Sequence, residues 1–124
     1  MPSLFWTLGC LSGASSVILG AFGAHGLKSR LDSPARLANW HTAAQYQLMH
    51  SVALLVAEQA APKGNVWAKS LFTAGITMFS GSLYLLVLDP ARFRFMGPVT
   101  PIGGTCLIGG WIALAIGSRG RLTV

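Results

Sequence analysis

Acidic side chains are the scarcest charged groups in this sequence, with three Asp and Glu residues among 124. Asp32 and Asp89 each stand close to a proline in a segment typical of a turn, which leaves Glu58 in an apolar stretch. A pair of carboxylates for acid–base chemistry is therefore hard to assemble. The sequence also lacks a nucleophile elbow and any zinc or phosphate motif. We therefore predict no catalytic residues and a protein that is not an enzyme.

Cysteine is scarcer still, with two residues, and its placement gives no sign of a metal centre. Cys10 and Cys106 both lie in apolar stretches without the spacing of metal ligands, so we interpret them as small packing residues. His41 and His50 are separated by about two and a half helical turns and cannot both bind one ion from a straight helix. The sequence thus predicts neither a metal site nor a cofactor.

Charge of either sign is rare. Only 10% of the residues are charged and 52% are hydrophobic, whereas soluble domains carry about 25% charged residues. A chain this short cannot hide so much apolar surface from water, because small domains have a high ratio of surface to volume. The composition therefore predicts an integral membrane protein. Its nine Lys and Arg residues are scattered between apolar blocks, which favours contact with lipid headgroups and argues against nucleic acid as a partner.

Four apolar blocks have the length of membrane-spanning helices, for which about 20 residues suffice. They cover residues 3–25, 41–60, 66–88 and 101–118. Transmembrane strands would instead alternate polar and apolar residues, which these blocks do not. The sequence predicts an all-α, integral membrane, up-down four-helix bundle that forms a single transmembrane domain over residues 1–124. An even number of spans places both termini on the same side of the membrane.

Capping residues and prolines mark the expected ends of the helices. Asp32 or Ser33 can cap the helix that comes after them. We expect residues 34–40 to form an interfacial helical extension of the second span, with Trp40 at the level of the headgroups. Pro101 and the glycines after it predict an irregular start of the fourth span.

Small residues gather on one side of the first and fourth predicted helices when successive residues are placed about 100° apart. Such residues let membrane helices approach closely, because packing drives their association. Each face serves either packing inside the bundle or binding of a second copy or another subunit. The candidate helix-packing residues are Gly9, Gly13, Gly20, Gly23, Gly103, Gly110 and Gly117.

Polar side chains line the second and third predicted spans, which a tight turn makes antiparallel neighbours. Exposing such groups to hydrocarbon is costly, so we predict that the two stripes face each other and form hydrogen bonds. The members of this candidate polar network are Tyr46, Gln47, His50, Ser51, Thr77, Ser80 and Tyr84. Two interpretations stay open: a hydrogen-bond network between helices, with Glu58 reaching Lys63 or water, or a proton path or ligand pocket.

Four stretches of the sequence together resemble a known membrane family. They read GAFGAHGLK (Gly20–Lys28), WHTAAQYQLMH (Trp40–His50), FSGSLYLL (Phe79–Leu86) and GPVTPIGGTCLIGGW (Gly97–Trp111). The sequence resembles, over nearly its whole length, the small four-helix membrane proteins that include transmembrane protein 256 of animals and YgdD-type proteins of bacteria. This resemblance implies a location in a bacterial or mitochondrial inner membrane but no reaction, since the family is of unknown function. The residues of these motifs include His25, Trp40, Gly81, Pro98, Pro101 and Gly104.

These observations predict a small polytopic membrane protein that acts through packing, as a structural or accessory component of a membrane protein assembly. Its expected partners are the lipid bilayer and either another membrane protein or further copies of itself. The alternative is a small carrier or channel that uses the polar face of the second span. A lone four-helix bundle has little room for a gated water-filled path, which favours the first function.

Overall fold

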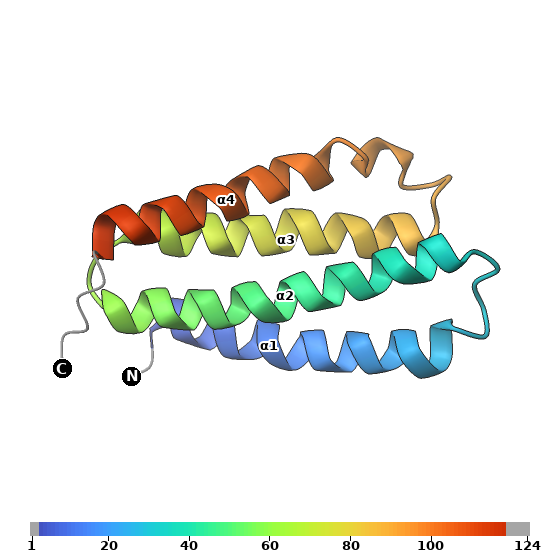
Figure 1. The fold of residues 1–124 in the computed structure, drawn as a ribbon, viewed down its shortest axis with the longest axis horizontal. Helices are drawn as coiled ribbons and strands as arrows, with labels where there is room; N and C mark the ends of the chain where they lie inside the picture. Colours follow the sequence, from blue (N-terminus) through green and yellow to red (C-terminus); the bar gives the residue numbers. More distant parts are fainter. Residues whose placement is uncertain (1–2, 119–124) are drawn as a thin grey trace.

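The computed structural model consists of four long α-helices that run up and down (Figure 1). Their bounds are Leu4–Phe22 for α1, Pro34–Ala60 for α2, Val66–Leu88 for α3 and Val99–Ser118 for α4. A π-helical turn, Gly23–Leu27, extends α1, and a 3₁₀ turn, Arg94–Met96, precedes α4. The structure describes residues 3–118, and residues 1, 2 and 119–124 lie outside this part. The predicted all-α, up-down architecture is confirmed.

Consecutive helices pack side by side along the chain, α1 against α2, α2 against α3, and α3 against α4. α1 and α4 make almost no contact with each other, so they form two open edges instead of closing a ring (Figure 1). α2 and α4 also touch only sparsely. As a result, α2 lies between α1 and α3, and α4 is held almost entirely by α3.

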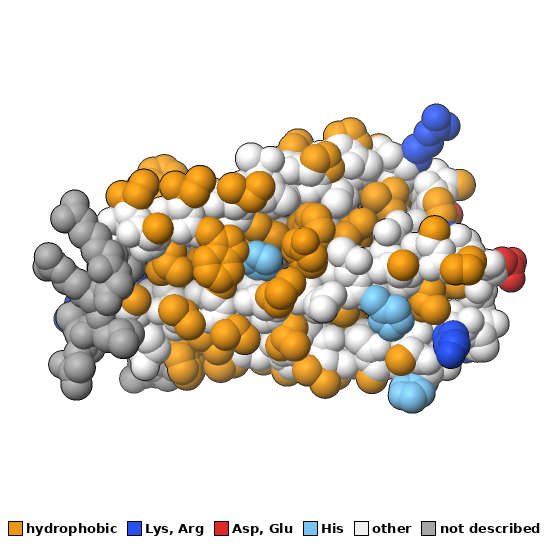
Figure 2. Space-filling model, viewed as in Figure 1, with side chains coloured by type: hydrophobic (Ala, Val, Ile, Leu, Met, Phe, Trp, Pro, Cys, Tyr) orange, Lys and Arg blue, Asp and Glu red, His pale blue; other side chains and the backbone are white. Residues whose placement is uncertain are grey.

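The outer surface has the character of a membrane protein. Hydrophobic side chains cover the middle of the visible face, and the charged side chains on it lie near its two ends (Figure 2). The segments long and apolar enough to cross a membrane are Leu4–Leu27, Val66–Leu88 and Arg94–Gly117. α2 is the exception, because its polar residues lower its hydrophobicity. It lies along both α1 and α3, so a bilayer that contains those two helices also contains α2.

The start of each long helix reflects its local chemistry. Ser33 caps α2 through its side-chain oxygen, and Pro34 occupies the first position, where it has no hydrogen bond to lose. The predicted extension at residues 34–40 is continuous with the second span.

The predicted irregular start of the fourth span is wrong. α4 is a regular helix from Val99, because Pro101 falls within its first turn.

Trp40 fixes how α1 ends against α2. Its ring is 2% exposed and packs against α1 and α3, beside Val87 near the end of α3, so it is buried in the protein. That Trp40 lies at the level of the headgroups stays a prediction. The indole nitrogen donates to the Leu19 carbonyl oxygen (2.8 Å), shortly before α1 changes into the π-helical turn. Gly23 makes room for the ring, since a Cβ atom there would clash with Trp40 Cδ1.

Glycines in α4 allow it to approach α3 closely. A Cβ atom on Gly103 would clash with the Phe79 amide nitrogen, and one on Gly110 would lie 2.7 Å from an aromatic ring of α3. A Cβ atom on Gly117 would lie 2.6 Å from the side chain of Asn65, the residue that caps α3. The small-residue side of α4 therefore faces α3 and its cap.

The small-residue side of α1 faces α2, but its glycines differ in how tightly they are packed. A Cβ atom on Gly9 would lie 2.6 Å from Leu55 Cδ2. At Gly13 and Gly20 it would lie 3.9 Å from the nearest atom, which is ordinary van der Waals contact. α1 therefore touches α2 tightly at Gly9 and again at Gly23, with looser packing between them.

A buried ion pair joins the end of α2 to the start of α3. The Lys69 Nζ atom lies 2.9 Å from Glu58 Oε2 and donates to the Ala61 carbonyl oxygen as well (2.9 Å). The two side chains are only 3% and 7% exposed. The prediction that Glu58 reaches Lys63 or water is therefore wrong, since Lys69 is its partner. Removing either member would leave an uncompensated buried charge.

Gly103→Ala should lower the stability of the protein by roughly 1–3 kcal/mol, because the added methyl group pushes α4 away from the α3 backbone. Gly81→Ala is the matched control, since no atom lies within 4 Å of a Cβ placed there and Ala favours a helix over Gly. Unfolding by SDS in mixed micelles, followed by circular dichroism, measures both. Equal stability of the two variants would show that Gly103 does not set the spacing of α3 and α4.

Gly23→Ala should displace the Trp40 ring and destabilise the protein by a similar amount, roughly 1–3 kcal/mol. Gly20→Ala lies on the same side of α1 and should be tolerated, because its Cβ atom would sit 3.9 Å from Ala44. The fluorescence emission of the Trp40 indole, in a variant whose other tryptophans are replaced by Phe, reports the displacement. An unchanged spectrum and melting temperature in Gly23→Ala would refute the tight fit.

Candidate functional site

Gln47 is the centre of a polar network that joins three helices. Its side chain is buried, and its Nε2 atom donates to the Ser12 carbonyl oxygen of α1 (2.9 Å). On the other side, the Tyr84 hydroxyl of α3 donates to Gln47 Oε1 (2.7 Å). The Ser51 hydroxyl extends the network by donating to the Ser12 hydroxyl (2.7 Å). The network therefore links α2 to α3, as the polar stripes indicate, and also to α1.

Ser80 and Thr77, the other candidate members on α3, behave differently. The buried Ser80 hydroxyl donates to the Ala43 carbonyl oxygen of α2 (2.7 Å). Thr77 is exposed, and its hydroxyl donates to the Thr73 carbonyl oxygen of its own helix (2.9 Å). Thr77 lines a small recess together with Leu54 of α2, but its hydroxyl does not form the predicted hydrogen bond to the second span. A threonine hydroxyl can be satisfied on the preceding turn, so it needs no second helix.

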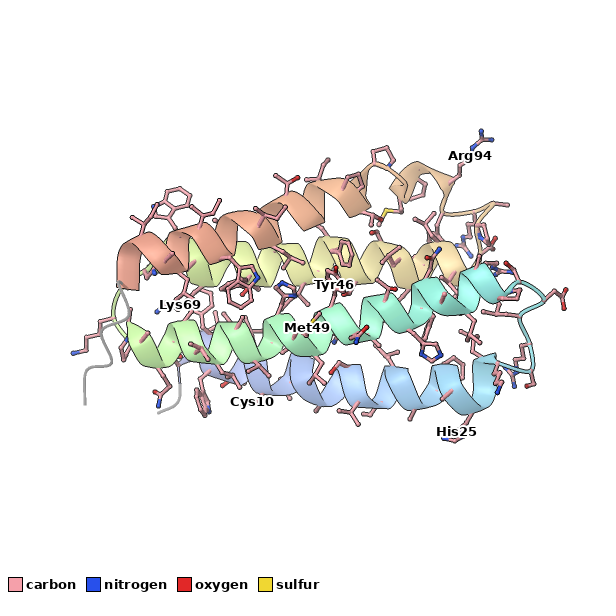
Figure 3. All side chains as sticks on the ribbon, viewed as in Figure 1. Cys10, His25, Tyr46, Met49, Lys69 and Arg94 are labelled. Carbon is pink, nitrogen blue, oxygen red and sulfur yellow. The ribbon has the colours of Figure 1, made fainter. Side chains whose placement is uncertain are left out.

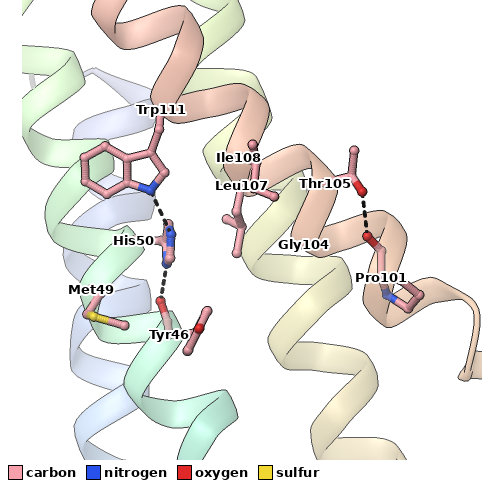
Figure 4. Close-up of a pocket in the computed structure, with 9 residues that line it drawn as sticks. All are labelled: Tyr46, Met49, His50, Pro101, Gly104, Thr105, Leu107, Ile108 and Trp111. Atoms are coloured by element: carbon pink, nitrogen blue, oxygen red, sulfur yellow. Dashed lines mark hydrogen bonds between the residues drawn. The ribbon is translucent and has the colours of Figure 1, made fainter.

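His50 bonds to α4 and not to α3, which corrects the predicted partner. Its Nδ1 atom lies 2.8 Å from the Tyr46 carbonyl oxygen, and the Trp111 Nε1 atom donates to His50 Nε2 (3.1 Å; Figure 4). A carbonyl oxygen only accepts and an indole N–H only donates. The two contacts therefore fit the neutral ring with its proton on Nδ1. Both ring nitrogens are occupied, and the ring also contacts Phe72 of α3 (6.1 Å between centroids).

A groove of about 560 Å³ lies between α2 and α4, where these two helices touch only sparsely (Figure 4). Aromatic and aliphatic side chains dominate its lining, and the Thr105 hydroxyl is bonded to the Pro101 carbonyl oxygen of its own helix (2.9 Å). The residues that line it are Tyr46, Met49, His50, Pro101, Gly104, Thr105, Leu107, Ile108 and Trp111. The groove is therefore an apolar recess with few polar groups.

Tyr46 supplies the groove with an unsatisfied polar group. The prediction that its side chain faces the bundle interior is wrong, because it is 38% exposed. The ring packs on Phe79 of α3 (4.8 Å between centroids), and the hydroxyl has no hydrogen-bond partner within residues 3–118. By contrast, no buried side-chain nitrogen or oxygen atom of these residues lacks a partner.

The remaining motif residues lie away from the network. His25 is exposed on the π-helical turn (Figure 3). Pro98 is exposed just before α4, and Gly81 is half-buried in α3. Pro101 and Gly104 line one end of the groove. Within residues 3–118, no three His, Cys, Asp or Glu side chains lie close enough to hold a metal ion. The groove therefore offers a packing surface and a few hydrogen-bonding groups.

The sequence interpretation missed Ser12 and Trp111 as members of the site. Ser12 lies beside the small-residue side of α1, and its role rests partly on its backbone carbonyl oxygen, which no side-chain pattern reveals. Trp111 ends the fourth motif stretch, and an indole N–H at membrane depth needs an acceptor. The need for an acceptor could therefore have predicted that Trp111 bonds to a polar residue of another helix, and His50 is such a residue.

Trp111→Phe removes the hydrogen bond to His50 but keeps an aromatic ring, so it should cost about 0.6 kcal/mol, the average for interhelical hydrogen bonds in membranes. A double-mutant cycle with His50→Leu measures the coupling between the two side chains. Trp67→Phe is the control, because Trp67 is 78% exposed and should show no coupling to His50. Additive effects of Trp111→Phe and His50→Leu would contradict the hydrogen bond.

Comparison with known proteins identifies a family. The family described as "Protein of unknown function (DUF423)" matches residues 19–104, from the end of α1 through α2 and α3 to the first turns of α4. A UPF0382 membrane protein of Staphylococcus aureus is 44% identical over 91% of this chain and 93% of its own length. Similar proteins of Haemophilus influenzae (41%, covering 95% of each chain) and Schizosaccharomyces pombe (37%, covering 90% and 98%) are named in the same way. No solved structure matches the chain.

The relatives are named membrane proteins and come from bacteria and a fission yeast. Their names agree with the apolar helices of the structure, and their sources agree with the predicted bacterial or mitochondrial inner membrane. The resemblance to a membrane family of unknown function is confirmed. The chain is thus a multi-pass integral membrane protein that belongs to the DUF423 family.

Proposed function

We propose that the protein is a non-catalytic accessory component of a membrane protein assembly, and that the groove between α2 and α4 receives a transmembrane helix of its partner. The observation that carries this proposal is the Tyr46 hydroxyl, which has no partner within residues 3–118 and lies at membrane depth. Hydrocarbon offers no hydrogen bonds, so an exposed hydroxyl there is destabilising until another polypeptide satisfies it.

The depth of Tyr46 is set by its contact with Phe79. Phe79 lies nine residues before the end of α3, which corresponds to about 14 Å of a helix roughly 34 Å long. Tyr46 is therefore close to the middle of the bilayer. A lipid headgroup does not reach that depth, whereas a transmembrane helix can bring a serine or threonine hydroxyl, or a backbone carbonyl oxygen beside a small residue.

The shape of the groove also suits a helix. Its volume of about 560 Å³ accommodates a row of side chains from one helix face. Gly104 presents no side chain, and Ile108 is 62% exposed at the rim. Because α4 is an edge helix that α1 does not cover, a partner has access to the groove from the side.

The alternative of a small carrier or channel gains no comparable support. The polar groups on the inner face of α2 are bonded to one another and to α1 and α3, and both ring nitrogens of His50 are occupied. A transport path would require these bonds to exchange during each cycle. The paired network fits a role in orienting helices, for which bonds that stay formed are sufficient.

Photo-crosslinking from the groove tests the proposed function. A photoreactive phenylalanine at position 108 should form an adduct with a transmembrane segment of another membrane protein in native membranes. Position 102 is the matched control, because Ile102 is 54% exposed on α4 but does not line the groove. Ile108→Trp should fill the groove and reduce recovery of the same partner by about tenfold or more, which corresponds to 1.4 kcal/mol. Ile102→Trp should leave recovery unchanged.

Three results would contradict this function. They are the absence of any adduct at position 108, equal adducts at positions 108 and 102, and full recovery of the partner by Ile108→Trp. The melting temperature of each variant in detergent, compared with that of the native protein, shows whether the fold is retained. If Ile108→Trp melts at a lower temperature than the native protein, Thr105→Trp replaces it, because Thr105 also lines the groove.

A further inference from the structure

Gln45 is a second polar side chain of α2 that no neighbour satisfies. It is exposed, and its amide has no hydrogen-bond partner within residues 3–118. It lies on the face of α2 beside α1, away from the groove between α2 and α4. The two surfaces share no lining residue, so a role for the Gln45 surface does not depend on the function proposed for the groove.

Gln45 lies well inside the membrane. The neighbouring turn of α2 is level with Ser80, because the Ser80 hydroxyl donates to the Ala43 carbonyl oxygen. Ser80 lies eight residues before the end of α3, or about 12 Å along a helix roughly 34 Å long. With a hydrocarbon core of about 30 Å centred on α3, this level is about 10 Å below the headgroups. Lys and Arg have stems that can reach the interface, but the side chain of Gln is too short for this.

The surroundings of Gln45 form a shallow recess of about 380 Å³ between α1 and α2. Gly20 and Ala44 line this recess and have no large side chains to fill it. His41 lies one helical turn before Gln45 on the same side. His41 is also exposed and has no hydrogen-bond partner within the described residues. Two unsatisfied polar side chains and a floor of small residues are the features of a helix-association surface.

We infer that this surface binds a second copy of the chain in a symmetric dimer whose two-fold axis runs along the membrane normal and passes near Gln45. Such an axis brings each residue to the same depth as its counterpart and close to it. A primary amide suits this position, because it has both a donor and an acceptor and can form two bonds with an identical amide. A charged residue would repel its counterpart, and no Lys, Arg, Asp or Glu lines the recess.

Other occupants fit the surface less well. A lipid acyl chain would fill the recess but leave the Gln45 amide unsatisfied. A different membrane protein would need an amide or hydroxyl of its own at the same depth. A second copy always has one there, because it carries the same Gln45 amide. The surface is therefore self-complementary in depth, in hydrogen bonding and in charge.

Cysteine crosslinking at adjacent positions tests the dimer. Leu48 lines the recess and Met49 lines the other groove, and the two side chains are 43% and 45% exposed, so they form a matched pair. In a chain with Cys10→Ser and Cys106→Ser, Leu48→Cys should give a disulfide-linked homodimer when native membranes are oxidised. Met49→Cys should give little product. A disulfide requires the two Cα atoms to approach within about 7 Å, so the yield reports the geometry.

Adding Gln45→Leu to Leu48→Cys should lower the crosslink yield about three- to eightfold, the change expected from one to two interhelical hydrogen bonds of average strength. Co-expression of two differently tagged copies identifies the product as a homodimer. Equal yields at positions 48 and 49, an adduct with another protein only, or no effect of Gln45→Leu would each overturn the inference. An unchanged melting temperature of the monomer in harsh detergent confirms that Gln45→Leu retains the fold.

Discussion

The buried polar groups of α2 must find hydrogen-bond partners inside the protein, because hydrocarbon provides none. α2 is the one long helix that lacks the apolarity of a membrane span, and it is placed between α1 and α3. Gln47 uses both ends of its amide in this position, donating to α1 and accepting from α3. The central place of α2 is therefore a consequence of its composition. At an edge of the fold, one end of the Gln47 amide would face lipid.

Close approach of the helices is the second requirement, and glycine supplies it unevenly. Backbone contact between α3 and α4 at Gly103 holds α4 against α3. Trp40 seated on Gly23 holds the end of α1 against α2. No glycine contact of this kind joins α2 to α4 in residues 3–118, where the hydrogen bond between Trp111 and His50 spans the gap. The groove thus exists because α4 packs closely on α3 but not on α2.

The sequence predicted the helices well because apolar length, capping residues and prolines act locally. α3 has the predicted bounds, and α2 begins at Pro34 with Ser33 as its cap. The partners of polar side chains were harder to predict. Helical periodicity shows which residues share a face, but a broad polar face can contact two neighbouring helices. The tight turn identified α3 as one neighbour of α2, and nothing in the pattern identified α1 as the other.

The same limit explains the residues that the sequence misplaced. Thr77 has a hydroxyl that its own helix can satisfy, so its polarity does not require a neighbour. Glu58 was expected to reach Lys63 or water, yet the long stem of Lys69 folds back to it and to the carbonyl oxygen of Ala61, the C-cap of α2. Trp40 is of a residue type common at the membrane interface, but its ring packs inside the protein because Gly23 has no side chain there. Glu58 and Trp40 thus contact residues of another helix, whereas Thr77 bonds within its own.

The unsatisfied polar groups reveal how the protein relates to the bilayer. Tyr46, Gln45 and His41 all lie on α2, on the side that α1, α3 and α4 leave open. In an isolated copy of the protein, α2 therefore exposes these unpaired polar groups to lipid, although it is the least apolar of the long helices. Any polypeptide that satisfies them stabilises the folded chain by mass action, since it binds the folded state and not the unfolded one. The proposed associations would therefore link stability to assembly through the same helix, whose inner face holds the fold together.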